Sequence, residues 1–525
     1  MSKRQIVNII NFIRGVEPRM DMDLITPVRE QIRLIDQYHF SATFLIQYDA
    51  LLMPEYQEIL RALDPARYEI GVWFEIPQPL AERCGLTWTG RYPWDWHCHC
   101  GFSAGYTHGQ KQLLLDELFS RFKEIFGYYP RVFGSWFFDS FTARYVTDTY
   151  GLDAMCNCKE QYGTDGYTLW GGYYGQGYYP SRTNVFMPAQ TANMQLNVPL
   201  FRMLGSDPVY QYDFGLDVSN SQNQVQGVIT LEPVYNASTG GGGGLPEWVD
   251  WYLNENYNGD CLSFGYAQAG QENSFGWDAM KDGLIYQFAR FDELSRQGLL
   301  TVEPLGATGR WFKETYPSTP ASAITAHSAF DDENKKSVWY CTKHYRINIY
   351  QDEQGLRIRD LHIFAEDYAD PYENTLCTAN DATYDTLPVV DGNLNSGNGI
   401  LSGLYLQDAA GSALQPFMPQ SEMTFSDLEN SRASVLFTDG SREVMFLLEE
   451  DAVEIHSSQK FVLRHAIGRK SHHLPAVTAQ SSDELALTYK NHAYRIVLES
   501  GSFSDTCTVT AQDNVIRAHF INGNR

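Results

Sequence analysis

Positive charge is scarce in this sequence. Across 525 residues it has 39 Lys and Arg against 64 Asp and Glu, a formal net charge of -25. Such a charge repels a phosphate backbone or an anionic membrane surface, and no basic stripe offsets it locally. The first apolar run stops at Arg14 and lacks a small-residue cleavage site. We therefore expect no nucleic-acid partner, no membrane partner and no export signal.

Several chemical motifs are also missing. There is no Gly-x-Ser-x-Gly nucleophile elbow, and the five glycines at 240–244 are not followed by the Lys-Ser/Thr pair of a phosphate-binding loop. The nine cysteines are odd in number, and Cys156 and Cys158 alternate along an expected strand. This usage predicts reduced thiols and a cytoplasmic protein. We expect no cofactor.

Aromatic residues, in contrast, are abundant. They make up 14% of the chain, with 33 Tyr and 11 Trp, and many stand in glycine-rich loops. Exposed aromatic faces stack on the C–H faces of sugar rings, although ordinary loop packing explains any single one equally well.

The hydrophobic pattern divides the chain into two parts. Up to residue 318, short β-branched or aromatic runs alternate with helical periodicity, which predicts an α/β domain with a mainly parallel sheet. We expect strands at 7–13, 41–47, 68–74, 131–138, 153–158, 198–204, 228–231 and 261–266, and helices at 26–38, 55–63, 110–126 and 277–297. From 319 to 525, short alternating runs separated by Gly, Asp and Asn turns predict an all-β sandwich domain.

Carboxylates follow many of the expected strands of the first part. In parallel α/β sheets, ligands bind at the carboxyl ends of the strands. A single carboxylate there is more often a helix N-cap, but many on one rim favour glycoside cleavage, which needs a pair of carboxyl groups. The carboxylates at these ends are Glu17, Glu75, Asp139, Glu160, Asp165, Glu232 and Glu272.

One segment could hold a metal ion. In Trp96-His97-Cys98-His99-Cys100, strand alternation would place His97 and His99 on one face and the two thiols on the other. Two imidazoles on one face could bind a metal or donate to sugar hydroxyls. The cysteine spacing is not that of a structural zinc site, so we predict no metal.

Four segments resemble the superfamily that unites NodB-type polysaccharide deacetylases with glycoside hydrolase families 57 and 38. They are 11–18 (NFIRGVEP), 68–79 (YEIGVWFEIPQP), 130–139 (PRVFGSWFFD) and 271–277 (QENSFGW). The resemblance covers most of residues 1–316 and implies an incomplete, (β/α)7-type barrel. It implies nothing about residues 321–525.

The resemblance also implies catalytic roles. The family 57 nucleophile at the end of the fourth strand matches Asp139, and the late acidic motif makes Glu272 the candidate acid, with Glu75 as a substitute. The Asp-Asp pair and the His-x-x-x-His motif of the deacetylases are absent, because the equivalent segments read Arg14-Gly15-Val16-Glu17-Pro18 and Val72-Trp73-Phe74-Glu75-Ile76-Pro77. A deacetylase or family 38 zinc site lacks its ligands here.

The sequence therefore predicts a metal-independent, retaining glycosidase or transglycosidase that acts on oligosaccharides. A deacetylase-like enzyme with an unusual metal site at His97 and His99, and a non-catalytic carbohydrate-binding protein, are the alternatives. The expected partner is a carbohydrate, and a homo-oligomer is left open. Expected substrate-binding residues are Glu17, Trp73, Trp96, His97, His99, Trp136, Lys159, Glu160, Asp165, Trp170 and Glu232.

Overall fold

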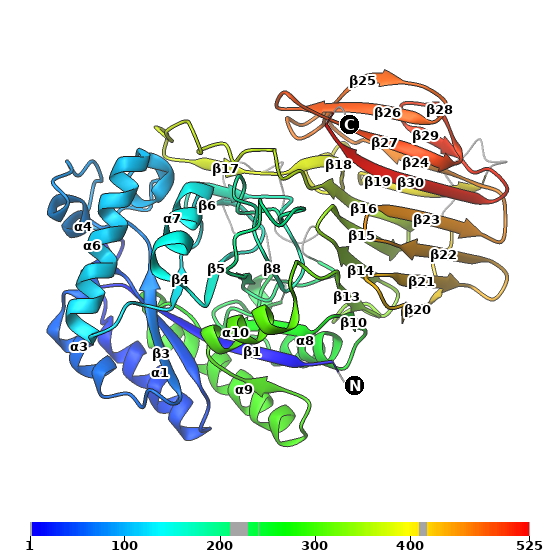
Figure 1. Ribbon diagram of the computed structural model, residues 1–525. Helices are drawn as coiled ribbons and strands as arrows, with labels where there is room; N and C mark the ends of the chain where they lie inside the picture. The colour runs from blue at the N-terminus through cyan, green and yellow to red at the C-terminus, as the bar shows by residue number, and fades with distance from the viewer. Residues whose placement is uncertain (1–2, 211–228, 240, 409–416, 524–525) are drawn as a thin grey trace.

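The computed structural model describes residues 3–210, 229–239, 241–408 and 417–523. Its first half contains a nine-stranded sheet, and its second half is built almost entirely from strands (Figure 1). No helix in the described ranges has the length and apolar character needed to cross a membrane. All nine cysteines are free thiols, as the sequence predicts.

The nine-stranded sheet is mainly parallel and curled into a half barrel. Its strand order is β11-β1-β2-β3-β4-β5-β9-β8, with β12 also beside β1 and only β8 antiparallel to its neighbour. The Gln268 side chain on β11 accepts a hydrogen bond from the amide of Leu204, the residue after β9, and so links these two strands across the open side of the half barrel. The bounds are β1 (Gln5–Ile13), β2 (Ala42–Ile46), β3 (Tyr68–Trp73), β4 (Val132–Gly134), β5 (Ala154–Cys158), β8 (Gly177–Tyr178), β9 (Leu200–Met203), β11 (Gly265–Ala269) and β12 (Thr301–Val302).

Amphipathic helices connect these strands. α6 (His108–Phe126) shows why the sequence folds this way locally: Thr107 and Gln110 form a capping box at its start, and Gly127 ends it at φ 85°. Its buried face consists mainly of leucine and phenylalanine. The others are α1 (Ile25–Gln37), α2 (Tyr48–Leu51), α3 (Pro54–Arg61), α4 (Gln78–Arg83), α5 (Cys98–Gly101), α7 (Ser140–Tyr150), α8 (Pro246–Tyr257), α9 (Trp277–Arg296) and α10 (Leu305–Thr315).

The second half contains two antiparallel sheets, seen stacked in Figure 1. Aliphatic residues from both, including Ile347 and Ile496, line an apolar space of about 410 Å³ between them. The first sheet contains β10 (Cys261–Leu262), β13 (Ser322–Ala326), β14 (Lys336–Cys341), β15 (Tyr345–Asp352), β16 (Gly355–Ile363), β18 (Leu387–Asp391), β19 (Gly403–Asp408), β24 (Phe461–Ala466), β28 (Ser502–Asp505) and β29 (Thr508–Thr510). The second contains β20 (Glu422–Asp427), β21 (Ala433–Thr438), β22 (Glu443–Leu448), β23 (Ala452–Ser457), β25 (Ala476–Gln480), β26 (Glu484–Tyr489), β27 (His492–Ser500) and β30 (Val515–Asn522).

Two strand pairings connect the halves. β10 pairs with β13, and β17 (Ala382–Tyr384) pairs in parallel with β7 (Tyr167–Leu169), which itself pairs with β6 (Gln161–Thr164). The expected boundary at 318/319 falls between α10 and β13. The halves therefore pack through backbone hydrogen bonds as well as side chains.

Most expected elements of the first half are present, with four differences. Residues 229–231 of the expected strand 228–231 form no strand, since Thr230 makes only an isolated bridge with Ser206. The expected strand 261–266 is divided into β10 and β11. β4 covers only Val132–Gly134 of the expected strand 131–138. The expected strand around His97 and His99 is wrong, because Cys98–Gly101 forms the short helix α5 and strand alternation does not apply. Residue 228 of the expected strand 228–231 lies outside the described residues.

Candidate functional site

A cleft of about 530 Å³ lies at the carboxyl ends of the parallel strands. The residues that line it come from segments far apart in the sequence, because the loops after the strands converge at this end of the sheet. They are Arg14, Glu17, Arg19, Met20, Trp136, Gln161, Thr164, Asp165, Tyr167, Leu204, Glu232, Tyr235, Glu272, Ser274 and Phe275.

Arg14, directly after β1, joins two of the predicted catalytic carboxylates. Its Nε and Nη2 donate to the two oxygens of Glu75 at 3.1 and 2.8 Å, and its Nη1 donates to Glu272 at 3.1 Å. The guanidinium carbon lies 3.9 Å from the ring centre of Trp94. A bidentate contact and an aromatic face fix the plane of the guanidinium.

Burial strongly affects the pKa values of Arg14 and Glu75. Arg14 is 2% exposed and Glu75 is fully buried. Burial raises the pKa of Glu75 to about 7, although the charge and hydrogen bonds of Arg14 oppose the rise. Burial alone would lower the pKa of Arg14, but Glu272 and Glu75 raise it above its ordinary value. Arg14 is thus a permanent cation held between two carboxylates.

Glu272 and Glu232 both line the cleft and are linked through Gln271. The Gln271 amide donates to Glu232 Oε1 at 3.0 Å, and its oxygen accepts from the Glu272 backbone N–H at 2.8 Å. Ser274 donates to Glu272 Oε1, and Thr230 donates to Glu232 Oε2. Glu272 Oε2 is buried and has no hydrogen-bond partner among the described protein atoms. An unpaired carboxylate oxygen at a cleft wall is available to a substrate.

A second ion-pair group forms another wall of the cleft. Arg19 donates to Glu17 from Nε at 2.8 Å and to Asp165 from Nη1 at 3.1 Å, so it connects the loop after β1 with the turn between β6 and β7. Burial would raise the pKa of Glu17, but hydrogen bonds from Arg19 lower it below the ordinary value. Arg19 also lies over Trp96, 5.0 Å from the ring centre.

Aromatic side chains pack below the cleft. Trp73 is fully buried and packs edge-on against Trp136, with ring centres 5.3 Å apart. Phe12 lies 4.2 Å from Trp73 and 5.5 Å from Trp136. Trp136 is the member of this trio that lines the cleft. Trp73 therefore supports Trp136, and Trp136 can stack on a sugar ring.

The His97 ring lies between those of Trp96 and His99 in a series of ring contacts, with its centre 6.1 Å from that of Trp96. The ring centres of His97 and His99 are 5.8 Å apart, and His97 Nδ1 is 3.8 Å from Asp95. Asp95 is already held by Arg91 through both carboxylate oxygens. Neither histidine lines the cleft.

Asp139 is not brought together with Glu75 and Glu272. It caps the N-terminus of α7, where its Oδ1 accepts from the Thr142 amide, and its Oδ2 lies 2.9 Å from Lys111 Nζ. Both side chains are buried. Burial and the nearby Asp139 raise the pKa of Asp370, which accepts from the Ser140 amide, to about 7. The strand-end carboxylate here stabilises a helix terminus and a buried ion pair.

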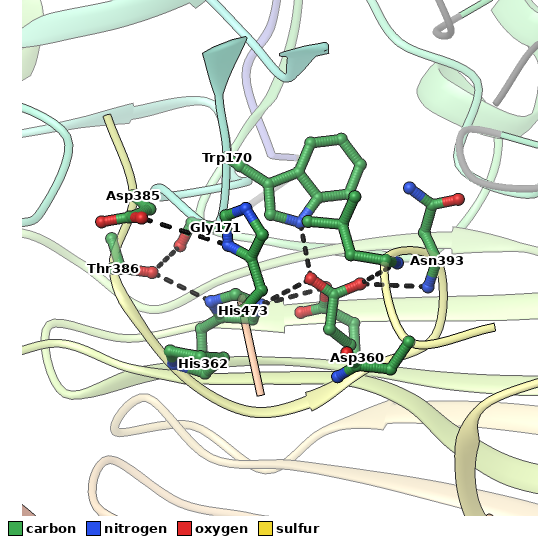
Figure 2. Close-up of polar contacts among 12 residues, drawn as sticks. Trp170, Gly171, Asp360, His362, Asp385, Thr386, Asn393 and His473 are labelled. Atoms are coloured by element: carbon green, nitrogen blue, oxygen red, sulfur yellow. Dashed lines mark hydrogen bonds and ion pairs between the residues drawn. The ribbon is translucent and has the colours of Figure 1, made fainter. Parts of the chain in front are cut away.

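Three further predicted substrate contacts lie against the second half of the chain. Glu160 pairs with Arg346 at 2.5 Å and accepts from the Gly171 amide. The Trp170 indole donates to Asp391, in a buried network with Asp360, His362 and Thr386 (Figure 2). Lys159 lies over the Tyr174 ring. None of the three lines the cleft.

Sequence reasoning overlooked several residues that the fold places here. Arg14 occupies the segment where the resembling deacetylases carry acidic residues, and that departure was the available signal. Tyr167 begins the short strand β7, and Tyr235 and Gln271 stand in loops; in none of these segments does a sequence period indicate where the side chain points.

The arrangement does not fit a resident metal ion. The position between Glu75 and Glu272 is taken by the Arg14 guanidinium, whose fixed charge repels a cation. Within the part of the chain that the structure describes, no group of three or more His, Cys, Asp or Glu side chains could hold a metal ion.

Comparison with solved structures supports the fold. A Parabacteroides distasonis protein, provisionally assigned as a glycoside hydrolase/deacetylase, matches 73% of this chain and 91% of its own at 14% identity and a TM-score of 0.52. A provisionally assigned polysaccharide deacetylase from Mycobacterium smegmatis matches 59% and 91% at 14% identity, with a TM-score of 0.35. A family 57 branching enzyme from Thermococcus kodakaraensis matches 60% and 72% at 9% identity, with a TM-score of 0.29.

The likeness to the Parabacteroides distasonis structure shows a shared fold over the part of this chain that it covers. No family model matches the sequence, and no curated protein matches it.

Proposed function

We propose that the protein is a carbohydrate-processing enzyme, a glycoside hydrolase whose two working carboxylates are Glu272 and Glu232. The observation that carries the proposal is the unpaired, buried Oε2 of Glu272 at a cleft that Glu232 also lines. Glycoside cleavage needs one carboxyl group to protonate the leaving oxygen and a second to attack carbon or activate water. The sequence-based nucleophile, Asp139, is replaced in this proposal because it is bound to Lys111 away from the cleft lining.

The contacts favour opposite roles for the two carboxylates. Glu272 is oriented by a hydrogen bond from Arg14, and its Oε2 has no partner among the described residues, so we assign it the role of nucleophile. Glu232 accepts hydrogen bonds from the Gln271 amide and the Thr230 hydroxyl, which hold it at the cleft, and we assign it the role of acid. Glu75 then serves as a positioning residue, because it orients Arg14 without lining the cleft.

The substrate surroundings follow from the cleft lining. We propose that Glu17 and Asp165 address sugar hydroxyls and that Trp136 stacks on a pyranose ring, with Trp96 held at the edge by Arg19. Trp73, His97 and His99 do not line the cleft, so we propose no direct substrate contact for them. The exposed Met20 and Phe275 add an apolar rim.

The finer architecture belongs to the same proposal. We interpret the parallel strands β1 to β5, β9 and β11, with the short β12 beside β1, as an incomplete (β/α)7-type barrel in residues 1–318. We interpret the two facing sheets of residues 319–525 as a β-sandwich domain. The nine free thiols favour a reducing compartment such as the cytoplasm. An oligosaccharide is the proposed partner.

The test is a panel of aryl glycosides assayed with and without a chelator. We expect turnover that survives chelation, is lost in Glu272→Gln, and is retained in Glu247→Gln, a matched change at an exposed glutamate on α8. Turnover that needs an added metal would favour the deacetylase-like alternative. Binding of oligosaccharides without turnover of any glycoside would favour the carbohydrate-binding alternative.

A further inference from the structure

A buried cluster of unpaired polar groups lies at the ends of β5 and β9, separate from the cleft lining. Asn157 on β5 and Arg202 on β9 are register partners, so their side chains point to the same side of the sheet. Lys159 is two residues beyond Asn157. β8 pairs Gly177 with Phe201, which brings Gln176 to the position next to Arg202. All four side chains are buried, with exposures of 0 to 7%.

These residues have hydrogen-bonding groups without protein partners. Both amide atoms of Asn157, both amide atoms of Gln176 and Nη2 of Arg202 are buried without a hydrogen-bond partner among the described residues. Buried polar groups of this kind are rare, because each one loses water without a replacement. The remaining Arg202 donors go to backbone oxygens, Nε to Cys158 and Nη1 to Tyr173, and therefore to no negative charge.

The cluster also has an excess of positive charge. Lys159 lies with its ammonium 4.4 Å from the centre of the Tyr174 ring and makes no ion pair within the described ranges. The nearest carboxylate in sequence, Glu160, is engaged by Arg346 and the Gly171 amide. Two buried cations without a carboxylate partner are unfavourable unless an anion joins them or one cation loses its proton.

We propose that Lys159 and Arg202, with the amides of Asn157 and Gln176, bind a small inorganic anion of the size of chloride. The four residues supply N–H donors and net positive charge, and their burial favours a small ion as the ligand. Cys158 and Met203 end β5 and β9, and the cleft residues Gln161 and Leu204 follow them closely. The anion would therefore fix the strand ends that carry one wall of the cleft.

Protonation of Lys159 is linked to this binding. Burial and the charge of Arg202 lower the pKa of Lys159 to about 7; the other groups that act on it are Cys341, Glu160 and Arg346. Anion binding requires the charged form. Chloride affinity should therefore fall by about 100-fold from pH 6 to pH 9, since the fraction of charged amine falls by that factor above a pKa of about 7.

The direct test is crystallography of the full chain soaked in sodium bromide. We expect an anomalous bromide peak within hydrogen-bonding distance of Lys159 Nζ and Arg202 Nη2. Thermal melting of the wild type should rise with sodium chloride and not with sodium methanesulfonate at equal ionic strength. No peak at these donors, or equal responses to the two salts, would overturn the proposal and leave bound water as the explanation.

Two variants extend the test. Asn157→Asp places a fixed negative charge beside Arg202 at unchanged size, so its melting temperature should no longer respond to chloride. Lys159→Met should also lose the response, whereas Lys123→Gln at a surface lysine on α6 should keep it. A full chloride response in a folded Asn157→Asp variant would contradict the proposed site. Because these readouts do not involve turnover, they are independent of the proposed enzyme activity.

Discussion

Arg14 Nη1 lies 3.1 Å from Glu272 Oε1, and the opposite edge of the same guanidinium holds Glu75. One cation thus neutralises part of the charge of two buried carboxylates, and it fixes Glu272 with Oε2 unpaired. The chemistry of the cleft therefore depends on a residue that cannot itself transfer a proton at neutral pH.

Removal of Arg14 should destabilise the protein strongly. Arg14→Met leaves Glu75 and Glu272 buried without their cation, which costs about 3–5 kcal/mol for a broken buried ion pair. Arg14→Lys keeps the charge but loses the bidentate contact and should lie between wild type and Arg14→Met. Urea unfolding monitored by tryptophan fluorescence measures the difference. A loss below 1 kcal/mol in Arg14→Met would show that these carboxylates do not need the guanidinium.

Glu75 should make stability depend on pH. Its pKa in the folded protein is raised to about 7, above the ordinary value near 4.5. The stabilisation linked to its proton is complete below pH 4.5 and is lost as pH rises through about 7, by up to roughly 3 kcal/mol. Relative to wild type, Glu75→Gln should show a flatter free energy of unfolding between pH 4.5 and 7. Parallel pH profiles for the two proteins would assign the slope to another group.

Glu232 should act as the proton donor to the leaving group. Glu232→Gln should lower kcat/KM by a factor of about 10²–10⁴ for substrates with basic leaving groups, because these need general acid catalysis. Aryl glycosides with an acidic phenol, such as dinitrophenol, should be far less affected. A series of aryl glycosides measures the dependence on leaving-group pKa in both proteins. An equal loss across the series would assign Glu232 to binding.

Asp139 should matter for stability and not for turnover. Asp139→Asn keeps the shape of the α7 cap but leaves Lys111 buried without its anion, so we expect a loss of about 3 kcal/mol or more. Lys111→Met in the Asp139→Asn background should recover part of it. Per folded molecule, turnover should stay near wild type. A variant with wild-type stability and turnover reduced by several orders of magnitude would restore the sequence-based assignment of Asp139 as nucleophile.

The sequence predicted the positions of helices and strands better than the directions in which individual side chains point. Apolar periodicity located the parallel strands, because each is buried on both sides and flanked by turn residues. The strand expected at His97 and His99 was wrong. A run of five residues is too short for its pattern to distinguish a strand from a single helical turn.

The candidate site was recovered only in part, for a similar reason. Glu17, Trp136, Asp165, Glu232 and Glu272 line the cleft, and their roles there stay predictions. Asp139 and Glu160 also follow strands, yet their carboxylates turn to Lys111 and Arg346. The position of a residue at a strand end determines at which end of the sheet it lies. Its side chain, however, turns toward a cation from a distant segment of the chain, and no local sequence pattern reveals that partner.

The stereochemistry of cleavage follows from the separation of Glu232 and Glu272. A nucleophilic carboxylate requires its acid partner at about 5–5.5 Å, whereas an inverting pair stands about 6.5–9.5 Å apart to admit a water molecule. The hydrogen bond from Arg14 fixes Glu272 with its Oε2 unpaired among the described residues, and an oxygen without a partner favours direct attack on carbon and a covalent intermediate. We therefore expect NMR of the first-formed product to show retained anomeric configuration. In Glu272→Ala, azide should restore turnover and give a glycosyl azide of inverted configuration, while Glu232→Ala should give the retained azide. An inverted product from the wild type would remove the nucleophilic role of Glu272 and leave it as the base that activates water.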